Sequence, residues 1–244
     1  MDKLNIQAIF DSIDGEENSF QGAGQLTTFI RLKGCQLRCI YCDTQYAQEA
    51  KPENWMTIDE VIQQIHFPKV TITGGEPLLQ KEAVEELCSR LQHCSFYGRP
   101  YTISVETNGT IQPTYFVDGV RYIVDFKLMS SGVMDKMNAL AFSSLRSCDV
   151  IKFVISDIED YKYARMLITE HLNWKARKVF SPAMEIKEVA EIIQVAALNA
   201  WPVENIVDIS WPRQLAELMI RDRVDAQFSL QIHKVLWPGI KEEK

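Results

Sequence analysis

The apolar residues of this chain follow two spacings, one typical of β-strands and the other of α-helices. Short apolar or β-branched runs predict strands at residues 6–10, 28–32, 70–73, 101–106, 120–126, 149–155, 178–180 and 228–233. Apolar residues three and four apart predict helices from residue 58 to about 66, at 79–91, from about 157 to 172, at 186–198 and at 214–219. Thr57 and Glu60 have the spacing of a capping box at the start of the first helix.

Strands and helices that alternate in this way predict a parallel sheet covered by helices. Polar motifs follow several of the strands, among them Gly74-Gly75-Glu76-Pro77 and Glu106-Thr107-Asn108-Gly109. The carboxyl ends of parallel strands meet at one edge of a sheet, so these motifs should share one site. There are too few units for an eight-stranded barrel. We therefore expect a partial α/β barrel, formed as a single domain over residues 1–244 because no repeat or linker divides the chain.

The segment 11–25 is polar and rich in glycine, which predicts a loop between the first two strands. It carries three acidic residues, Asp14, Glu16 and Glu17. Loops on the rim of a rigid scaffold often contact ligands, so these carboxylates are candidates for hydrogen bonds to a polar heterocycle. A solvated turn is an equally good interpretation of the same composition.

The composition is that of an ordinary globular protein, with 46% hydrophobic and 24% charged residues in 244. A net charge of -7 argues against a surface that binds nucleic acid. No apolar run approaches the length of a membrane span, and residues 1–5 do not resemble a secretory signal. We expect a cytoplasmic protein, and the reducing cytosol argues against reading its six cysteines as disulfides.

Three cysteines, Cys35, Cys39 and Cys42, lie in one short loop directly after the apolar run 28–32. Thiolates bind iron-sulfur clusters and zinc, and a tight loop lets three of them converge on one inorganic centre. Nothing nearby supplies a fourth cysteine, which favours a cluster with one iron left open for another ligand. A zinc site that borrows His66 or His93 is the alternative. The other three cysteines are scattered, and we interpret them as ordinary thiols.

Arg31 lies within the apolar strand that precedes the cysteine loop. A buried arginine without an anionic partner is costly, so this residue should meet an acidic side chain such as Glu106 or an anionic ligand. Farther along, Gly74 and Gly75 join a strand to a helix. Glycines permit a close approach of the backbone to a ligand, and a helix N-terminus presents free N–H groups to a carboxylate.

The spacing C-x-x-x-C-x-x-C, with Tyr41 inside the last gap, resembles the cluster motif of the radical S-adenosylmethionine (SAM) enzymes. Narrower features resemble one family among them, the 7-carboxy-7-deazaguanine synthases (QueE). These features are Phe29-Ile30-Arg31-Leu32, Cys42-Asp43-Thr44, Thr73 before the glycines, and Gln231-Ile232-His233-Lys234. The resemblance covers nearly the whole chain.

The resemblance implies a lyase that converts 6-carboxy-5,6,7,8-tetrahydropterin to 7-carboxy-7-deazaguanine with loss of ammonia, in 7-deazapurine (queuosine-type) biosynthesis. It implies three cofactors, a 4Fe-4S cluster, SAM and Mg²⁺. The cluster would break SAM to give a 5′-deoxyadenosyl radical, which abstracts hydrogen from the substrate. The protein itself would orient these groups and exclude water.

The resemblance also implies a role for each matching residue. The cluster ligands would be Cys35, Cys39 and Cys42, and the magnesium ligand would be the hydroxyl of Thr44. The residues expected to line SAM are Tyr41, Asp43, Gly75, Glu76, Lys127, Ser181 and Pro182. The residues expected to contact the pterin are Ile13, Asp14, Gly15, Glu16, Arg31, Thr73 and His233, with Arg31 gripping its carboxylate.

Two features depart from the family pattern. Asp14-Gly15-Glu16-Glu17 stands where members usually read Q-G-E-G, and residues 237–244 continue past the usual end. The expected partners are the pterin, an electron donor such as a flavodoxin and a second copy of the chain in a homodimer, with no nucleic acid and no membrane. Two other classes stay open at this point, a glycyl-radical activating enzyme and a non-catalytic zinc-binding module.

Overall fold

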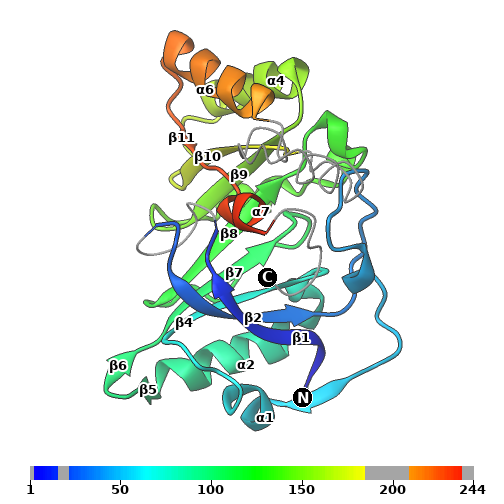
Figure 1. Ribbon diagram of the computed structural model, residues 1–244, viewed down its shortest axis with the longest axis vertical. Coiled ribbons are helices and arrows are strands. Elements are labelled where there is room, and N and C mark those ends of the chain that lie inside the picture. Colours follow the sequence, from blue (N-terminus) through cyan, green and yellow to red (C-terminus); the bar gives the residue numbers. More distant parts are fainter. Residues whose placement is uncertain (1–2, 16–21, 185–208, 238–244) are drawn as a thin grey trace, which may run out of the picture.

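The computed structural model describes residues 3–15, 22–184 and 209–237 and is organised around one nine-stranded sheet (Figure 1). The strand order is β11-β10-β9-β8-β7-β4-β2-β1-β3. The bounds are β1 Lys3–Ile13, β2 Leu26–Leu32, β3 Trp55–Thr57, β4 Lys69–Gly74, β7 Thr102–Thr107, β8 Val120–Phe126, β9 Val150–Ile155, β10 Arg177–Pro182 and β11 Gln227–Phe228. A separate hairpin pairs β5, Ser95–Phe96, with β6, Arg99–Pro100.

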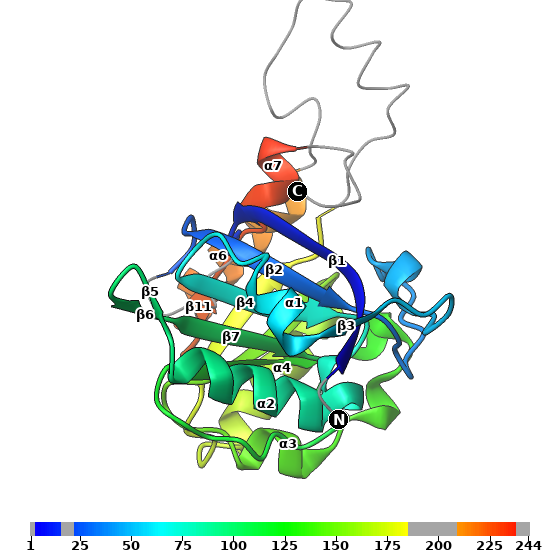
Figure 2. The same ribbon diagram turned by 90° about the horizontal axis from the view of Figure 1, so that it is seen from below.

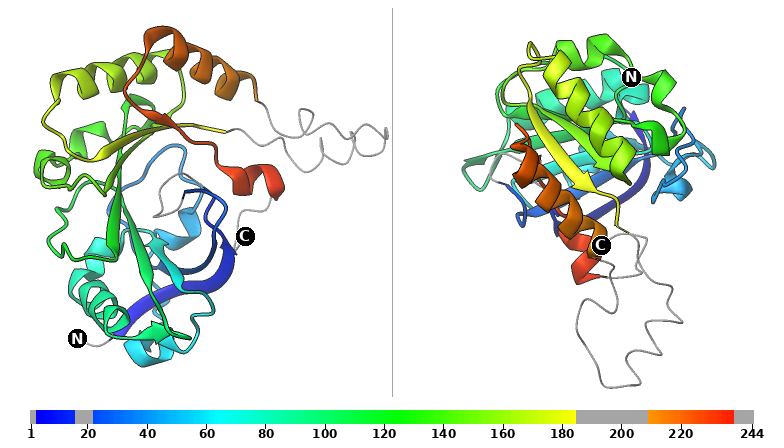
Figure 3. Two further views of the ribbon diagram at one scale, coloured as in Figure 1. Left: turned by 90° about the vertical axis from the view of Figure 1, so that its left-hand side faces the viewer. Right: turned by 90° about the horizontal axis from the view of Figure 1, so that it is seen from above.

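The sheet is parallel from β2 to β11 and becomes antiparallel at its other end. There β1 pairs antiparallel with β2, and β3 pairs antiparallel with β1. Within the described residues the two edge strands, β11 and β3, do not pair with each other, so the curved sheet forms a partial barrel (Figure 3). The predicted partial α/β barrel is confirmed, whereas the prediction of a parallel sheet is wrong at β1 and β3, which pair antiparallel.

The helices lie on both sides of this sheet, but unequally. Their bounds are α1 Ile58–Ile62, α2 Lys81–Gln92, α3 Ala139–Ser143, α4 Ile158–Glu170, α6 Ser210–Asp222 and α7 Ile232–Leu236, with 3-10 turns at η1 Gln45–Ala47, η2 Pro77–Gln80, η3 Met129–Ser131 and η4 Met134–Lys136. Seen from below, α2 and α3 cover one face, while α7 lies on the opposite side (Figure 2). Figure 3 shows the same separation, with α7 facing the hollow of the sheet. In the described part of the chain, no helix is long and apolar enough to cross a membrane.

Alternation along each strand explains why the two faces differ. On β4 and β7, Ile72 and Val105 point toward the helices and are fully buried beside Leu87 of α2 in the main core. Their neighbours Thr71 and Ser104 are equally buried on the other face. The hollow face is therefore lined by polar side chains, as expected of a face that holds a site.

The first helix begins where its sequence predicts and ends sooner. The Thr57 side chain accepts a hydrogen bond from Glu60 N, and the Glu60 carboxylate accepts one from Thr57 N at 2.7 Å, which completes the capping box. The helix ends at Ile62 instead of near residue 66. Pro68 disfavours helical backbone in the residue before it, and the chain turns there into β4.

The predicted last strand, residues 228–233, is wrong. Strand pairing stops at Phe228, and the chain then enters α7. Alternating Phe228, Leu230 and Ile232 imitate a strand, but Leu230 and Val235 pack against Met184 in a small apolar cluster away from the main core. The predicted helix 186–198 lies outside the described residues.

We predict that Leu87→Ala lowers the free energy of unfolding by about 2–5 kcal/mol, because it leaves a cavity in the fully buried centre of α2. Denaturant unfolding measures the change. Leu172→Ala is the matched control, since Leu172 is 82% exposed and its replacement should shift stability by no more than ~0.5 kcal/mol. Equal losses in the two variants would contradict this account of the core.

Candidate active site

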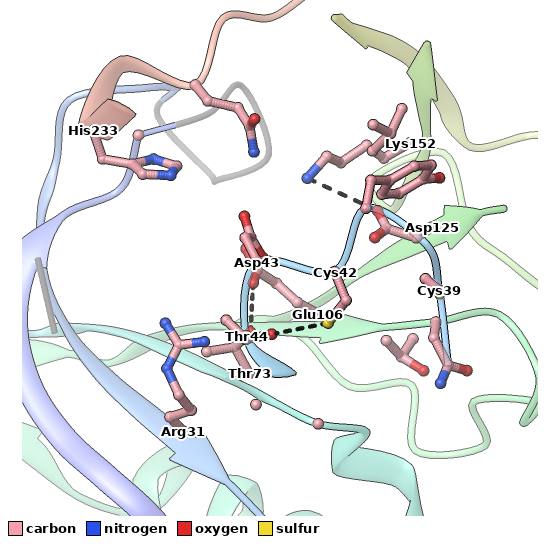
Figure 4. Close-up of a pocket in the computed structure, with 18 of the residues that line it drawn as sticks. Arg31, Cys39, Cys42, Asp43, Thr44, Thr73, Glu106, Asp125, Lys152 and His233 are labelled. Carbon is pink, nitrogen blue, oxygen red and sulfur yellow. Dashed lines mark hydrogen bonds and ion pairs between the residues drawn. The ribbon is translucent and has the colours of Figure 1, made fainter. Parts of the chain in front are cut away.

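A cavity of about 280 Å³ opens at the carboxyl ends of the parallel strands. Most of the predicted site residues line it, although they come from segments far apart in the sequence. These are Ile13, Asp14, Gly15, Arg31, Cys35, Cys39, Tyr41, Cys42, Asp43, Thr44, Thr73, Gly75, Lys127 and His233. Figure 4 shows His233 and Lys152 pointing into this space from opposite sides, with Arg31 below them.

The loop that carries the three cysteines is fixed by backbone hydrogen bonds at both of its sides. At its start, Gly34 N donates to Ala47 O at 2.9 Å and Cys35 N donates to Gln48 O at 2.9 Å. At its outer side, Ile40 N donates to Ser131 O at 3.0 Å. The loop is therefore held in place before any cofactor binds.

Gly75 lets the turn after β4 pack directly on this loop. Its N–H donates to Leu32 O at 3.0 Å, and a Cβ at this position would overlap the carbonyl of Gly34. A larger residue would push the turn away from the cysteine loop. The tertiary packing thus accounts for the glycine.

The buried side chain of Glu76 connects the turn after β4 to the turn after β7. It has no exposed surface, and its carboxylate accepts hydrogen bonds from Leu78 N at 2.8 Å, Thr107 Oγ1 at 2.6 Å and Asn108 N at 2.7 Å. The sequence predicted that free N–H groups at this turn would bind the carboxylate of a ligand. The N–H of Leu78 instead donates to the carboxylate of Glu76, which belongs to the chain itself. The residue does not line the cavity.

The three thiols line one cavity but do not surround a single ion. Cys35 Sγ lies 3.6 Å from Asn108 Nδ2, and Cys42 Sγ lies 3.8 Å from Thr44 Oγ1. Within the described residues, no three or more Cys, His, Asp or Glu side chains are placed to hold one metal ion. A zinc ion requires four ligands at one point, whereas an iron-sulfur cluster is larger and accepts thiolates that stand apart. The donor set therefore fits a cluster with three protein thiolates.

Burial affects the protonation of these thiols. It raises the pKa of Cys35 and Cys39 above the usual value of a thiol. Both groups are consequently protonated at neutral pH in the free protein. Iron must displace those protons, so cluster assembly should release them.

Arg31 reaches the cavity from β2 and lies between two aromatic rings. Its guanidinium carbon is 5.4 Å from the ring centre of Phe10 and 5.8 Å from that of Tyr46. Across residues 3–15, 22–184 and 209–237 its buried Nε has no hydrogen-bond partner, and Arg31 forms no ion pair with Glu106. Glu106 instead accepts a hydrogen bond from Thr73 Oγ1 at 2.7 Å. Arg31 thus presents an unused donor and a positive charge to the cavity.

A carboxylate between two lysines forms the opposite wall. Lys127 Nζ lies 2.6 Å from Asp125 Oδ2, and Lys152 Nζ lies 3.9 Å from Asp125 Oδ1. Burial alone would lower the pKa of Lys127, but Asp125 and the nearby Tyr41 and Cys39 raise it above the usual value, so the ammonium stays charged. Burial also raises the pKa of Tyr41 to about 12, which keeps its hydroxyl protonated.

The remaining predicted residues divide into three groups. Ser181 and Pro182 end β10 but do not line the cavity, where Ala183 and Met184 stand instead. Glu16 lies outside the described residues. Asp125, Lys152 and Lys234 line the cavity although no role was predicted for them. The available signal was a charge inside an apolar strand, which identified Arg31 and applies equally to Asp125 and Lys152.

Known proteins resemble the chain in both sequence and structure. The model of the radical SAM superfamily matches residues 29–118. A 7-carboxy-7-deazaguanine synthase of Chlorobaculum tepidum is 35% identical, with 96% of this chain and 94% of that protein covered. The protein of the same name from Clostridium acetobutylicum is 33% identical, with 93% of each chain covered.

A solved structure shares the fold at lower identity. The crystal structure of QueE from Escherichia coli superposes with a TM-score of 0.64 and 19% identity, covering 95% of both chains. This structural similarity supports the partial barrel. The family itself is shown by the relatives of higher sequence identity. Together with a cavity lined by Cys35, Cys39 and Cys42, they show that the chain belongs to the 7-carboxy-7-deazaguanine synthase family of radical SAM enzymes.

Proposed function

We propose that this protein converts 6-carboxy-5,6,7,8-tetrahydropterin to 7-carboxy-7-deazaguanine with loss of ammonia. One observation carries the proposal beyond the family name. The cavity that holds the three thiols also holds Arg31, whose buried Nε lacks a hydrogen-bond partner among the described residues. A substrate with a carboxylate would supply what this guanidinium lacks.

The proposed cluster ligands are Cys35, Cys39 and Cys42. When bound, the 4Fe-4S cluster and SAM supply the radical chemistry that begins the reaction. The chain's own task is to fix the cysteine loop, through Gly34, Cys35 and Ile40, and to keep the surrounding space shielded from water.

We place SAM beside the cysteine loop, on the side formed by Tyr41, Asp43, Gly75 and Lys127, which all line the cavity. Lys127 stays charged there and is suited to a carboxylate. Glu76 supports this side through the turns that it joins, without facing the cavity. Contacts of SAM with Ser181 and Pro182 stay predictions.

The pterin would lie on the other side, against Arg31, Thr73 and His233. Thr73 holds Glu106 by a hydrogen bond, which fixes the carboxylate at the floor of this side. Ile13 at the end of β1 and the next two residues, Asp14 and Gly15, complete the wall, and a contact with Glu16 stays a prediction. Mg²⁺ would bind the hydroxyl of Thr44, with the remaining ligands from substrate and water, because this ion keeps much of its hydration.

A reductant would deliver its electron where the cysteine loop reaches the surface. Ile40, between Cys39 and Cys42, is 75% exposed and gives a partner access to this loop. We propose a flavodoxin-type donor there. The homodimer, the single-domain organisation and the cytoplasmic location also stay predictions.

Anaerobic incubation with SAM, dithionite, Mg²⁺ and the carboxylated tetrahydropterin tests the reaction as a whole. The deazapurine absorbance should rise with time only when all components are present. Cleavage of SAM without this product would contradict the proposed substrate.

We predict that Cys39→Ala loses the four-iron cluster and all turnover, because two thiolates do not hold it. Iron and sulfide analysis after anaerobic reconstitution measures the loss. Cys94→Ala is the control, since that thiol is exposed and lies outside the cavity. A full cluster in Cys39→Ala would refute the ligand assignment.

We predict that Arg31→Lys lowers kcat/KM roughly tenfold to a hundredfold, because a lysine keeps the charge but loses the paired hydrogen bonds. SAM binding should not change. Thermal unfolding on the same preparation separates this from a structural role. A melting temperature several degrees lower with unaltered kcat/KM would make Arg31 a structural residue.

We predict that Thr44→Val leaves the cluster and SAM cleavage intact but removes most of the stimulation by Mg²⁺. The substitution nearly preserves shape and removes only the hydroxyl oxygen. Activity is titrated against Mg²⁺ in parent and variant. Superimposable curves would exclude Thr44 as the ligand.

A further inference from the structure

The chain after β11 crosses from one end of the sheet to the other. Ser229 N still donates to Phe180 O of β10 at 3.0 Å. Three residues later, Ile232 N donates to Gly15 O at 2.9 Å, in the loop that follows β1. Strands β10 and β1 lie near opposite ends of the strand order, so this short segment spans the open side of the partial barrel.

The segment 229–236 brings His233 to the cavity and holds it against Gly15. Both residues line the cavity, and a Cβ on Gly15 would overlap the ring nitrogen Nδ1 of His233. The absence of a side chain at position 15 therefore lets the imidazole approach the backbone. The position of His233 depends on where α7 sits.

The next residue, Lys234, reaches the cysteine loop. Its Nζ lies 3.2 Å from Asp43 Oδ2, and its side chain is only 17% exposed. Asp43 stands between Cys42 and Thr44. Within the described residues, the other hydrogen bonds of Cys42 and Thr44 are local ones, to Cys39, to Ala47 and to each other. The ion pair between Asp43 and Lys234 thus connects this part of the cysteine loop to a distant segment of the chain.

We propose that Lys234 is a positioning residue that couples the segment 229–236 to the cysteine loop. A pterin held against His233 would fix α7, and α7 would in turn fix Asp43 and its neighbours through the ion pair. The family resemblance assigns no such role to Lys234. The inference rests on the proposed placement of the substrate against His233.

Hydrogen–deuterium exchange of the reconstituted enzyme with SAM tests this coupling. The carboxylated tetrahydropterin is added without reductant, so that no turnover occurs. In the parent we expect the substrate to slow exchange in two segments, 229–236 and 39–47. In Lys234→Met the protection of 229–236 should persist, whereas that of 39–47 should fall at least to half.

The matched control breaks another ion pair of the same loop. Arg38 Nη2 lies 2.8 Å from Glu49 Oε1, but both side chains are largely exposed and neither belongs to the segment 229–236. Glu49→Gln removes the charge of this pair and leaves the hydrogen bonds from Arg38 Nη1 to Cys35 O and Leu37 O in place, so it should keep both protections. Lys234→Arg should restore the protection that Lys234→Met loses.

The possible failures are distinguishable. Unchanged protection of 39–47 in Lys234→Met, with the parent responding in both segments, would overturn the coupling and leave the proposed function intact. A parent whose segment 229–236 does not respond to the pterin would overturn the placement of substrate against His233 and the coupling with it. Cluster content and melting temperature, measured on each variant, must match the parent.

Discussion

The turns that follow β4 and β7 meet at one carboxylate, that of Glu76. Its oxygens accept hydrogen bonds from two backbone N–H groups and from the hydroxyl of Thr107, and the backbone N–H of Glu76 donates to Gly34 O at 2.7 Å. The start of the cysteine loop is thereby fixed to the same point. Without this carboxylate, buried donors would lose their partners at a cost of about 1–3 kcal/mol each. The placement of Cys35 beside Asn108 depends on these hydrogen bonds of Glu76.

Several of the charged side chains in the cavity wall have an oppositely charged neighbour among the described residues, and Asp125 has two. Asp125 lies between Lys127 and Lys152, and Asp43 pairs with Lys234. Such pairing offsets part of the desolvation that burial imposes on each lysine. Arg31 differs, because its guanidinium lies between aromatic rings and forms no ion pair within the described residues, although its charge helps to lower the pKa of Asp43. An anion that enters the cavity would therefore meet a guanidinium that is not already in an ion pair.

The open sheet explains why the C-terminal segment is part of the site. A closed barrel surrounds its ligand with strands, but here β11 and β3 are the two edges of the sheet that the described residues form, and β1 runs antiparallel. The segment 229–236 crosses the open side of the sheet. It contacts both Gly15, in the loop that follows β1, and Asp43, in the cysteine loop. It completes the wall of the cavity with side chains that the sheet does not provide.

Most of the site residues expected from the family resemblance line the cavity, and the structure brings them together from distant segments. The sequence by itself determined the strands and helices whose apolar period was clear and the spacing of the cluster motif. These features are local, because a period or a spacing is contained in a few neighbouring residues. Only the tertiary structure decided the direction of β1, the helical end at Ile232–Leu236 and the internal use of Glu76. Each depends on partners far away in the chain: Leu32 of β2, Met184 beneath α7, and Asn108 after β7. Contacts between residues so far apart in the sequence are fixed by packing and by the hydrogen bonds that buried groups must make. No local sequence pattern encodes them.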